Sequence, residues 1–125
     1  MIDHQKLKPS FEHAVKGVHY AMRENQNLRI HLILAVLALV LAILLQVNPF
    51  ELAVVELTIL LVIAAEMINT AIEQMVDLIT TEHRKEAEIA KDVSAGMVLV
   101  TAVGAIVIGV LIFSPYILRI IDIAL

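Results

Sequence analysis

Between Val93 and Leu118 the chain carries no charged side chain, and this apolar run constrains the possible folds more than any other feature. A helix needs about 20 mostly apolar residues to cross the hydrocarbon core of a bilayer. The composition agrees, because 60% of the 125 residues are hydrophobic and 18% are charged, whereas soluble domains average about 45–50% apolar and about 25% charged residues. We therefore expect an all-α integral membrane protein with a single domain over residues 1–125.

The composition also excludes several functional classes. The dominance of apolar residues argues against disorder, and the lack of cysteine excludes a disulfide scaffold and a cysteine-based metal site. The formal net charge of −4 argues against nucleic acid as a partner. Residues 1–29 hold no continuous apolar stretch, so we expect no cleaved signal peptide.

Three apolar stretches are long enough to cross a membrane, and they cover about residues 30–47, 52–79 and 93–118. Asn48-Pro49 separates the first two, because proline disfavours a helical conformation in the residue before it. The charged run 81–92 separates the second from the third. Lysines and arginines gather before the first stretch and in this charged run, so the positive-inside rule places both in the cytoplasm. We expect a multi-pass protein of the inner (plasma) membrane with a cytoplasmic active site and N-terminus.

Residues 10–28 have the pattern of an amphipathic helix that precedes the first span. Ser10, after Pro9, is a suitable N-cap. One face is apolar, and the other is charged or polar. The apolar face consists of Phe11, Ala14, Val15, Val18 and Met22. This pattern favours a helix that lies on the membrane surface, and packing against protein is the alternative.

The second span carries polar side chains where a membrane would favour leucine or alanine. Glu66, Asn69, Glu73 and Asp77 are spaced by three, four and four residues, which places them on one helix face. A charged side chain near the bilayer centre costs a few kcal/mol, so such residues are functional candidates. Adjacent ionised carboxylates need a cation, and oxygen ligands suit Mg²⁺. A general base and polar contacts between helices are the alternatives.

Lys91-Asp92 lies at the entrance to the third span. Lysine binds phosphate as a point charge, and the neighbouring aspartate can hold a metal-bound water or position the lysine. Taken alone, the pair is explained better by a snorkelling lysine and a helix-starting aspartate. The sequence lacks the glycine-rich phosphate loops of soluble nucleotide-binding proteins.

The polar motif of the second span, Glu66-Met-Ile-Asn69-Thr-Ala-Ile-Glu73-Gln-Met-Val-Asp77, resembles the signature E-x-x-N-S/T-A-I-E-x-x-x-D. This signature belongs to the small prokaryotic lipid kinases, the diacylglycerol kinase and undecaprenol kinase family. Residues 90–96 resemble the second signature of that family, and the likeness extends to residues 16–17 and 27–31. The resemblance implies a homotrimer of three-span subunits with N-terminal surface helices. It also implies transfer of the ATP γ-phosphate to a lipid hydroxyl.

The resemblance further implies a role for each matching residue. Glu66 corresponds to the catalytic base, Asn69 to a residue that orients the reacting groups, and Glu73 to a magnesium ligand. The positions that correspond to the nucleotide site are Asp77, Glu82, His83, Lys91 and Asp92, with Lys6 and His13 as further N-terminal contacts.

One position departs from the family pattern. Many members have a second magnesium-binding glutamate two residues before the position of Asn27, where this chain has Asn25. Glu24 stands one residue earlier, and a shift of one residue turns a helical side chain by about 100°. We expect either Asn25 to serve as a weaker ligand or the helix to adjust so that Glu24 takes that role.

The substrate is predicted by resemblance alone. Residues 27–31 and 93–96 are more similar to undecaprenol kinases, which favours undecaprenol over diacylglycerol as the acceptor. Two other classes stay open. A small transporter, in which Glu66 or Glu73 couples to protons or cations, would not explain Lys91-Asp92. A non-catalytic scaffold would tolerate the loss of the Glu66 carboxylate.

Overall fold

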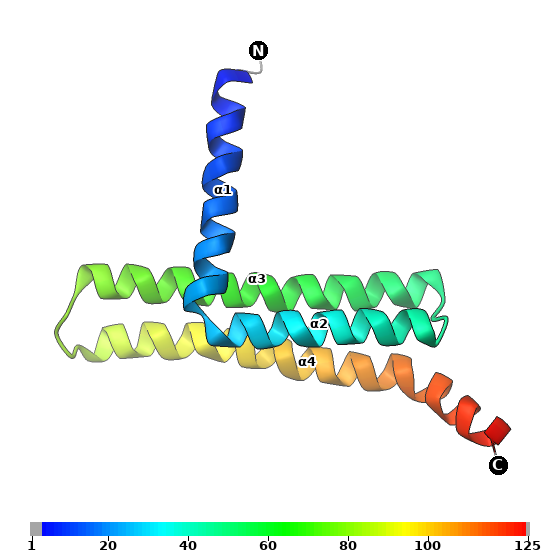
Figure 1. The fold of residues 1–125 in the computed structure, drawn as a ribbon. Coiled ribbons are helices and arrows are strands. Elements are labelled where there is room, and N and C mark those ends of the chain that lie inside the picture. The colour runs from blue at the N-terminus through cyan, green and yellow to red at the C-terminus, as the bar shows by residue number, and fades with distance from the viewer. Residues whose placement is uncertain (1–3, 125) are drawn as a thin grey trace.

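The computed structural model describes residues 4–124, and this part of the chain forms four helices (Figure 1). The helices are α1 (His4–Glu24), α2 (Gln26–Leu44), α3 (Pro49–Ile79) and α4 (Lys85–Ala124). Helices α2, α3 and α4 run side by side as a bundle, and α1 leaves the bundle crosswise (Figure 1). The all-helical fold class is thereby confirmed for the described residues.

Two of these helices, α2 and α4, are long and apolar enough to cross a membrane. Helix α2 has 19 residues, and at about 1.5 Å per residue it is about 28 Å long. That length is close to the hydrocarbon thickness of a bilayer, about 30 Å. Helix α3, the predicted second span, has 31 residues and extends beyond α2 at one end (Figure 1). Its membrane crossing, and with it the count of three spans, stays a prediction.

Helix α1 begins at His4 rather than at Ser10, so the predicted N-cap is wrong. Pro9 lies inside the helix and costs it one backbone hydrogen bond. The lysine, leucine and glutamine residues that precede Pro9 are good helix formers, and they extend the helix towards the N-terminus. The side chain of Lys6 lies outside the described residues.

The break between α1 and α2 falls at Asn25, so the predicted amphipathic helix ends before residue 28. Asn25 has an extended backbone, and its Oδ1 accepts the N–H of Leu28 at 2.9 Å. Asparagine is a preferred N-cap because its side chain satisfies a free N–H at the helix start. Residues 23–27 are all polar and include neither proline nor glycine, so they gave no clear sign of a break.

The C-terminal end of α1 is fixed to the bundle by polar side chains. Arg29 Nη1 donates to the carbonyl oxygens of Met22 and Arg23, at 3.1 and 2.6 Å. These carbonyls lie in the last turn of α1, where they have no partner within the helix. Tyr20 donates its hydroxyl to Gln74 Oε1 of α3 at 3.0 Å. Together these bonds hold α1 crosswise to α2 and α3.

The connection between α2 and α3 lies at the opposite end of the bundle and is tied to α4. Asn48 caps α3 by accepting the N–H of Glu51 at 3.0 Å, and Pro49 occupies the first turn. Tyr116 of α4 donates its hydroxyl to Glu51 Oε2 at 2.6 Å. The same hydroxyl oxygen accepts the backbone N–H of Asn48 at 3.2 Å. One tyrosine therefore joins α4 to the start of α3 and to the connection that follows α2.

Helix α4 is longer than the predicted third span at both ends. Residues 85–92 of the predicted loop are helical, with Glu86 and Glu88 in the first turn, where the helix dipole favours acidic side chains. Near the other end, Pro115 cannot donate a backbone hydrogen bond. The last turns of α4 bend away from the bundle (Figure 1).

The interior of the bundle contains few large side chains. Small residues let helices approach closely, and most large apolar side chains of α2, α3 and α4 face outwards. The buried apolar residues of these helices are Leu28, Ala35, Ala42, Val55, Val62, Ala65 and Ile112. The exposed apolar faces suit contact with lipid or with further subunits.

The tie made by Tyr116 predicts an effect on stability. Tyr116→Phe removes the hydroxyl and leaves Glu51 and the Asn48 N–H without this partner. We expect a loss of about 1–3 kcal/mol in the free energy of unfolding, measured by SDS denaturation in mixed micelles. Tyr20→Phe, which removes an exposed hydrogen bond, is the matched control and should cost less. Equal losses in the two variants would contradict the tie.

Candidate active site

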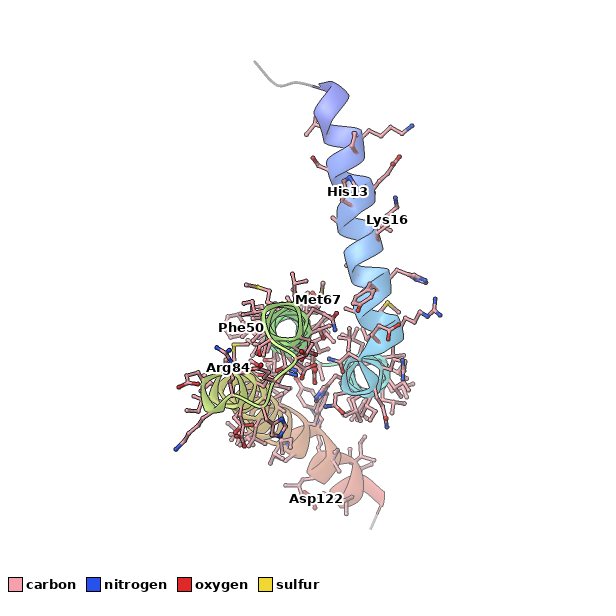
Figure 2. All side chains as sticks on the ribbon, turned by 90° about the vertical axis from the view of Figure 1, so that its left-hand side faces the viewer. His13, Lys16, Phe50, Met67, Arg84 and Asp122 are labelled. Carbon is pink, nitrogen blue, oxygen red and sulfur yellow. The ribbon has the colours of Figure 1, made fainter. Side chains whose placement is uncertain are left out.

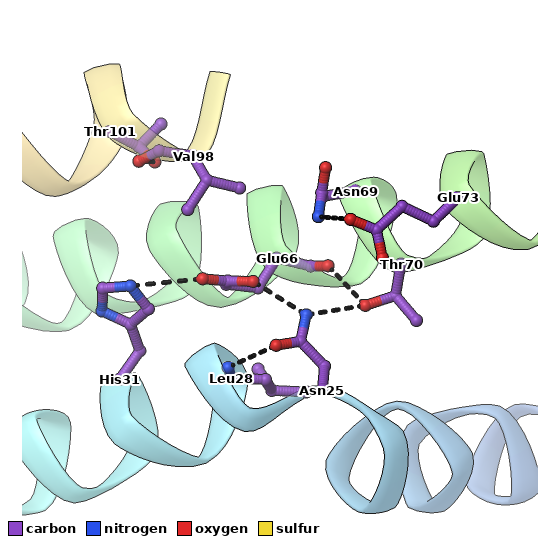
Figure 3. A network of polar contacts seen from close by, with 9 residues as sticks. All are labelled: Asn25, Leu28, His31, Glu66, Asn69, Thr70, Glu73, Val98 and Thr101. Atoms are coloured by element: carbon purple, nitrogen blue, oxygen red, sulfur yellow. Dashed lines mark hydrogen bonds and ion pairs between the residues drawn. The ribbon is translucent and has the colours of Figure 1, made fainter. Parts of the chain in front are cut away.

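The centre of the candidate site is Glu66, whose side chain is only 1% exposed within the bundle. Burial of a carboxylate without hydrogen bonds is unfavourable. Asn25 donates its Nδ2 to Glu66 Oε2 at 2.9 Å and to Thr70 Oγ1 at 2.8 Å (Figure 3). Thr70 in turn donates to the backbone carbonyl of Glu66 at 3.0 Å. The α1–α2 break therefore places a donor directly against the carboxylate.

The other oxygen of Glu66 faces a histidine of α2. His31 Nε2 lies 3.2 Å from Glu66 Oε1 (Figure 3). The distance suits an ion pair, but the direction of approach does not make a hydrogen bond. Oε1 is therefore buried without a hydrogen-bond partner in the described part of the chain. His31 is 22% exposed, so it separates Glu66 from the surface of the bundle.

Asn69 of α3 forms hydrogen bonds with Glu73 on the same helix and with α4. Its Nδ2 donates to Glu73 Oε1 at 2.9 Å, one turn further along the helix. Its Oδ1 accepts the hydroxyl of Ser94 from α4 at 2.6 Å, and both partners of this bond are buried. The Asn69 amide thus has a fixed orientation, with one end towards Glu73 and the other towards α4.

A cavity of about 580 Å³ lies between the end of α3 and the start of α4. Such a volume is in the range of small-molecule sites. At this cavity Lys91 Nζ and Asp77 Oδ1 form an ion pair at 2.5 Å. The cavity is lined by five predicted nucleotide-site residues, namely Asp77, Glu82, His83, Lys91 and Asp92. The structure therefore brings these five residues together.

The charge in this cavity is mixed. Its lining holds four carboxylates and only two permanently cationic side chains, Lys91 and Arg84. Arg84 is paired with Glu82 at 3.2 Å. Lys91 can attract a phosphate, whereas the excess of carboxylates disfavours a bare anion. The balance fits a phosphate group accompanied by a divalent cation better than a free phosphate.

The donor set near Glu73 suits Mg²⁺ in kind. The ligand is the Glu73 carboxylate itself, since Asn69 turns its nitrogen rather than its oxygen towards Glu73, and Mg²⁺ commonly uses only one or two carboxylates together with substrate phosphates. The described residues contain no cluster of three or more histidine or acidic side chains that could hold a metal alone. Of the two alternative ligands, Asn25 uses its oxygen to cap α2. Glu24 is half-exposed and lies 3.6 Å from Arg23.

His13 is not brought to the cavity by its own chain. It lies exposed on the part of α1 that extends away from the bundle, as Figure 2 shows. Residues at the end of α3, at the start of α4 and in the connection between them line the cavity instead. A role for His13 or Lys6 at a nucleotide would therefore need the α1 helix of another subunit.

A second cavity, of about 230 Å³, lies further along the bundle. Side chains of α2, α3 and α4 line it, and nearly all of them are apolar. His31 and Thr58 are its polar residues. Because His31 also contacts Glu66, this cavity ends next to the buried carboxylate.

The sequence analysis did not single out three residues of this network, namely Ser94, Thr70 and His31. Ser94 lies in the stretch 90–96 and Thr70 follows Asn69, so both stood inside recognised motifs. His31 ends the stretch 27–31, to which the resemblance extends without implying a role for it. Only the packing of α2 on α3 reveals its contact with Glu66.

Comparison with known proteins gives consistent matches. The family described as prokaryotic diacylglycerol kinase matches residues 12–113. A diacylglycerol kinase of Synechocystis sp. is 40% identical over 110 residues, which cover 87% of this chain and 63% of that protein. The chain thus spans less than two thirds of this relative. An undecaprenol kinase of Bacillus subtilis is 40% identical over 106 residues, which cover 85% of this chain and 86% of that protein.

The bond between Ser94 and Asn69 predicts a further stability effect. Ser94→Ala leaves the buried Asn69 oxygen without its donor, and an unsatisfied buried group costs about 1–3 kcal/mol. Thermal unfolding in detergent should show this loss. The control is Thr101→Val, because Thr101 bonds only to the Val98 carbonyl of its own helix and should matter less. A Ser94→Ala variant as stable as the wild type would contradict this contact.

Proposed function

Because the chain belongs to the prokaryotic diacylglycerol kinase family, we propose that it transfers the γ-phosphate of ATP to the hydroxyl of a membrane lipid. Undecaprenol is the favoured acceptor, which would give undecaprenyl phosphate, and diacylglycerol is the alternative. The undecaprenol kinase of B. subtilis supports this order, since the match covers 86% of that protein and only 63% of the Synechocystis diacylglycerol kinase.

The observation that carries this proposal is the level of Glu66 along the bundle. Glu66 contacts Asn25, the residue that caps the start of α2. Because α2 is about as long as the hydrocarbon core is thick, its start marks the boundary between apolar layer and headgroups. A lipid hydroxyl resides at this boundary. Glu66 is thus a buried carboxylate at the depth of the group to be phosphorylated.

The order of groups along α3 supports phosphoryl transfer. At about 1.5 Å per residue, Glu73 follows Glu66 by about 10 Å and Asp77 follows it by about 16 Å. Along α3, the proposed base would then lie at the lipid hydroxyl and the proposed metal ligand at the γ-phosphate. The nucleotide cavity would hold the rest of ATP. Phosphoryl transfer depends mainly on positioning and charge neutralisation, which these residues are suited to supply.

In the proposed reaction, Glu66 takes the proton of the lipid hydroxyl while the oxygen of that hydroxyl forms a bond to the γ-phosphorus of ATP. The bond from that phosphorus to the β–γ bridging oxygen breaks, and ADP leaves. Asn69 orients the reacting groups, and Lys91 binds phosphate oxygens. Glu73 would hold Mg²⁺, which when bound neutralises phosphate charge. Asp77, Glu82, His83 and Asp92 surround the remainder of the nucleotide.

The apolar cavity beside His31 is suited to the start of the acceptor chain. Its lining is apolar apart from His31 and Thr58, and it ends next to Glu66. A prenyl or acyl chain in this cavity would direct its hydroxyl towards the carboxylate. The chain would otherwise extend into the surrounding lipid.

We further propose a homotrimer of three-span subunits in the inner membrane, with α1 on the cytoplasmic surface. The crosswise direction of α1 relative to the bundle supports a surface location (Figure 1). Helix α1 has 21 residues and is therefore about 32 Å long, which is long enough to reach beyond its own bundle. His13 and Lys6 would then contact nucleotide in a neighbouring subunit.

The role of Glu66 is tested by Glu66→Gln. We expect phosphate transfer to fall by about 100- to 10,000-fold, the usual contribution of a general base, with binding of Mg²⁺-ATP largely retained. The measurement is transfer of labelled γ-phosphate to undecaprenol or diacylglycerol in separate micelles. Glu56→Gln is the matched control, since Glu56 is exposed on the same helix. Full activity of folded Glu66→Gln protein would contradict the proposed base.

Lys91 provides a second test, this time of nucleotide binding. Lys91→Met removes the cation from the cavity, and we expect KM for ATP to rise at least about tenfold, as for a lost charged contact of about 1.4 kcal/mol. Lys85→Met changes a neighbouring lysine outside the cavity lining and should leave KM unchanged. Equal KM values for the two variants would argue against phosphate binding by Lys91.

A further inference from the structure

We propose that Asn25 is a positioning residue for the catalytic carboxylate, holding Glu66 Oε2 so that Oε1 is the oxygen that takes the lipid proton. This inference rests on the proposed function, because it assigns a task to the base named there. It differs from the sequence-based expectation, in which either Asn25 is a weaker magnesium ligand or Glu24 takes that role. The contacts of the Asn25 amide carry the argument.

Both ends of the amide are engaged, and their orientation follows from chemistry. The N–H of Leu28 at the start of α2 needs an acceptor, and of the two ends of the Asn25 amide only Oδ1 can accept. The Glu66 carboxylate needs a donor, and of the two ends of this amide only Nδ2 can donate. A flipped amide would place oxygen against carboxylate and NH₂ against N–H. The orientation is therefore determined by its partners.

The second hydrogen of Nδ2 is also used. It points to Thr70 Oγ1 at 2.8 Å, while the first points to Glu66 Oε2 at 2.9 Å. Thr70 is buried and is itself anchored to the Glu66 carbonyl. With both donors satisfied and the oxygen capping α2, the amide has no reason to turn towards Glu73. Asn25 is thus built into the support of Glu66.

This support distinguishes the two carboxylate oxygens. A hydrogen bond from a donor stabilises negative charge on the oxygen that accepts it. Oε2 has such a bond, whereas Oε1 is buried without one and faces His31. The proton of the acceptor hydroxyl therefore goes to Oε1, on the side where His31 borders the apolar cavity.

The amide also changes what the site requires of metal ions. A carboxylate at position 25 would lie against the Glu66 carboxylate, and two such groups need a cation between them or a shared proton. Asn25 supplies N–H donors in that place. The base is then held by the protein itself, independently of the ion proposed at Glu73.

The test compares Asn25→Asp and Asn25→Ser, which both keep an N-cap side chain and lose the NH₂ group. We expect kcat to fall about 10- to 100-fold, the range for a lost hydrogen bond to a charged group. In Asn25→Ser, which adds no charge, KM for ATP and the half-saturating Mg²⁺ concentration should stay within about twofold, a range far below the change expected in kcat. Gln26→Glu makes the same amide-to-carboxylate change at an exposed neighbour and should be neutral.

Two results would overturn the proposal. The first is wild-type kcat in both folded variants. The second is a strong change in the Mg²⁺ requirement of Asn25→Ser, because the loss of an uncharged amide would then have removed part of the metal site. Should neither variant fold, Thr70→Val leaves the α2 cap intact and removes one acceptor of the amide. A lower kcat then supports the proposal, and an unchanged kcat overturns it.

A spectroscopic measurement separates this proposal from the proposed function. The infrared difference between wild type and Glu66→Gln isolates the Glu66 carboxylate bands. Adding Asn25→Ser to both proteins should shift these bands, because Oε2 loses its donor. If the wild type phosphorylates no lipid but the bands shift, the function fails while the positioning contact stands. Bands that do not move contradict the contact even in an active enzyme.

Discussion

The structure depends on the burial of one carboxylate, Glu66, where three helices meet. A charge removed from water is tolerated only with hydrogen bonds or a partner charge. Here the donor comes from Asn25, outside α3, so the carboxylate is satisfied only when α2 is docked with its first turn beside Glu66. The apolar surfaces of α2 and α3 favour contact but are nearly uniform along their length. The buried charge selects one relative position.

This requirement explains the arrangement at the end of the bundle where α1 joins α2. Asn25 both ends the run of helix that starts in α1 and caps α2, so the change in chain direction occurs where Glu66 needs its donor. About one turn further along α3, a second amide joins two helices in the same way, because Asn69 forms hydrogen bonds with Glu73 and with Ser94 of α4. Beyond this level α3 and α4 continue without α2, and the large cavity opens between them.

Much of this could be predicted from the sequence. The helical class, the end of α3 near residue 79 and the gathering of Asp77, Glu82 and Lys91 follow from hydropathy, helical spacing and family motifs. The start of α1 was missed because Pro9-Ser10 has the pattern of a helix start, and the break at Asn25 was missed because residues 23–27 contain no proline or glycine. The contact of His31 with Glu66 was also missed, because it depends on the side-by-side packing of α2 and α3.

The Tyr116 tie at the far end of the bundle has a consequence for how this chain can diverge. Directional bonds join the helices at the two ends, through Asn25 and Ser94 at one and Tyr116 at the other. Between them the helices meet through small apolar side chains. The outward-facing apolar positions of the middle turns can therefore exchange one aliphatic residue for another with little penalty, whereas loss of the polar side chains at the ends would remove the bonds that fix the relative position of the helices. Sequence tolerance should be highest at mid-membrane and lowest at both boundaries.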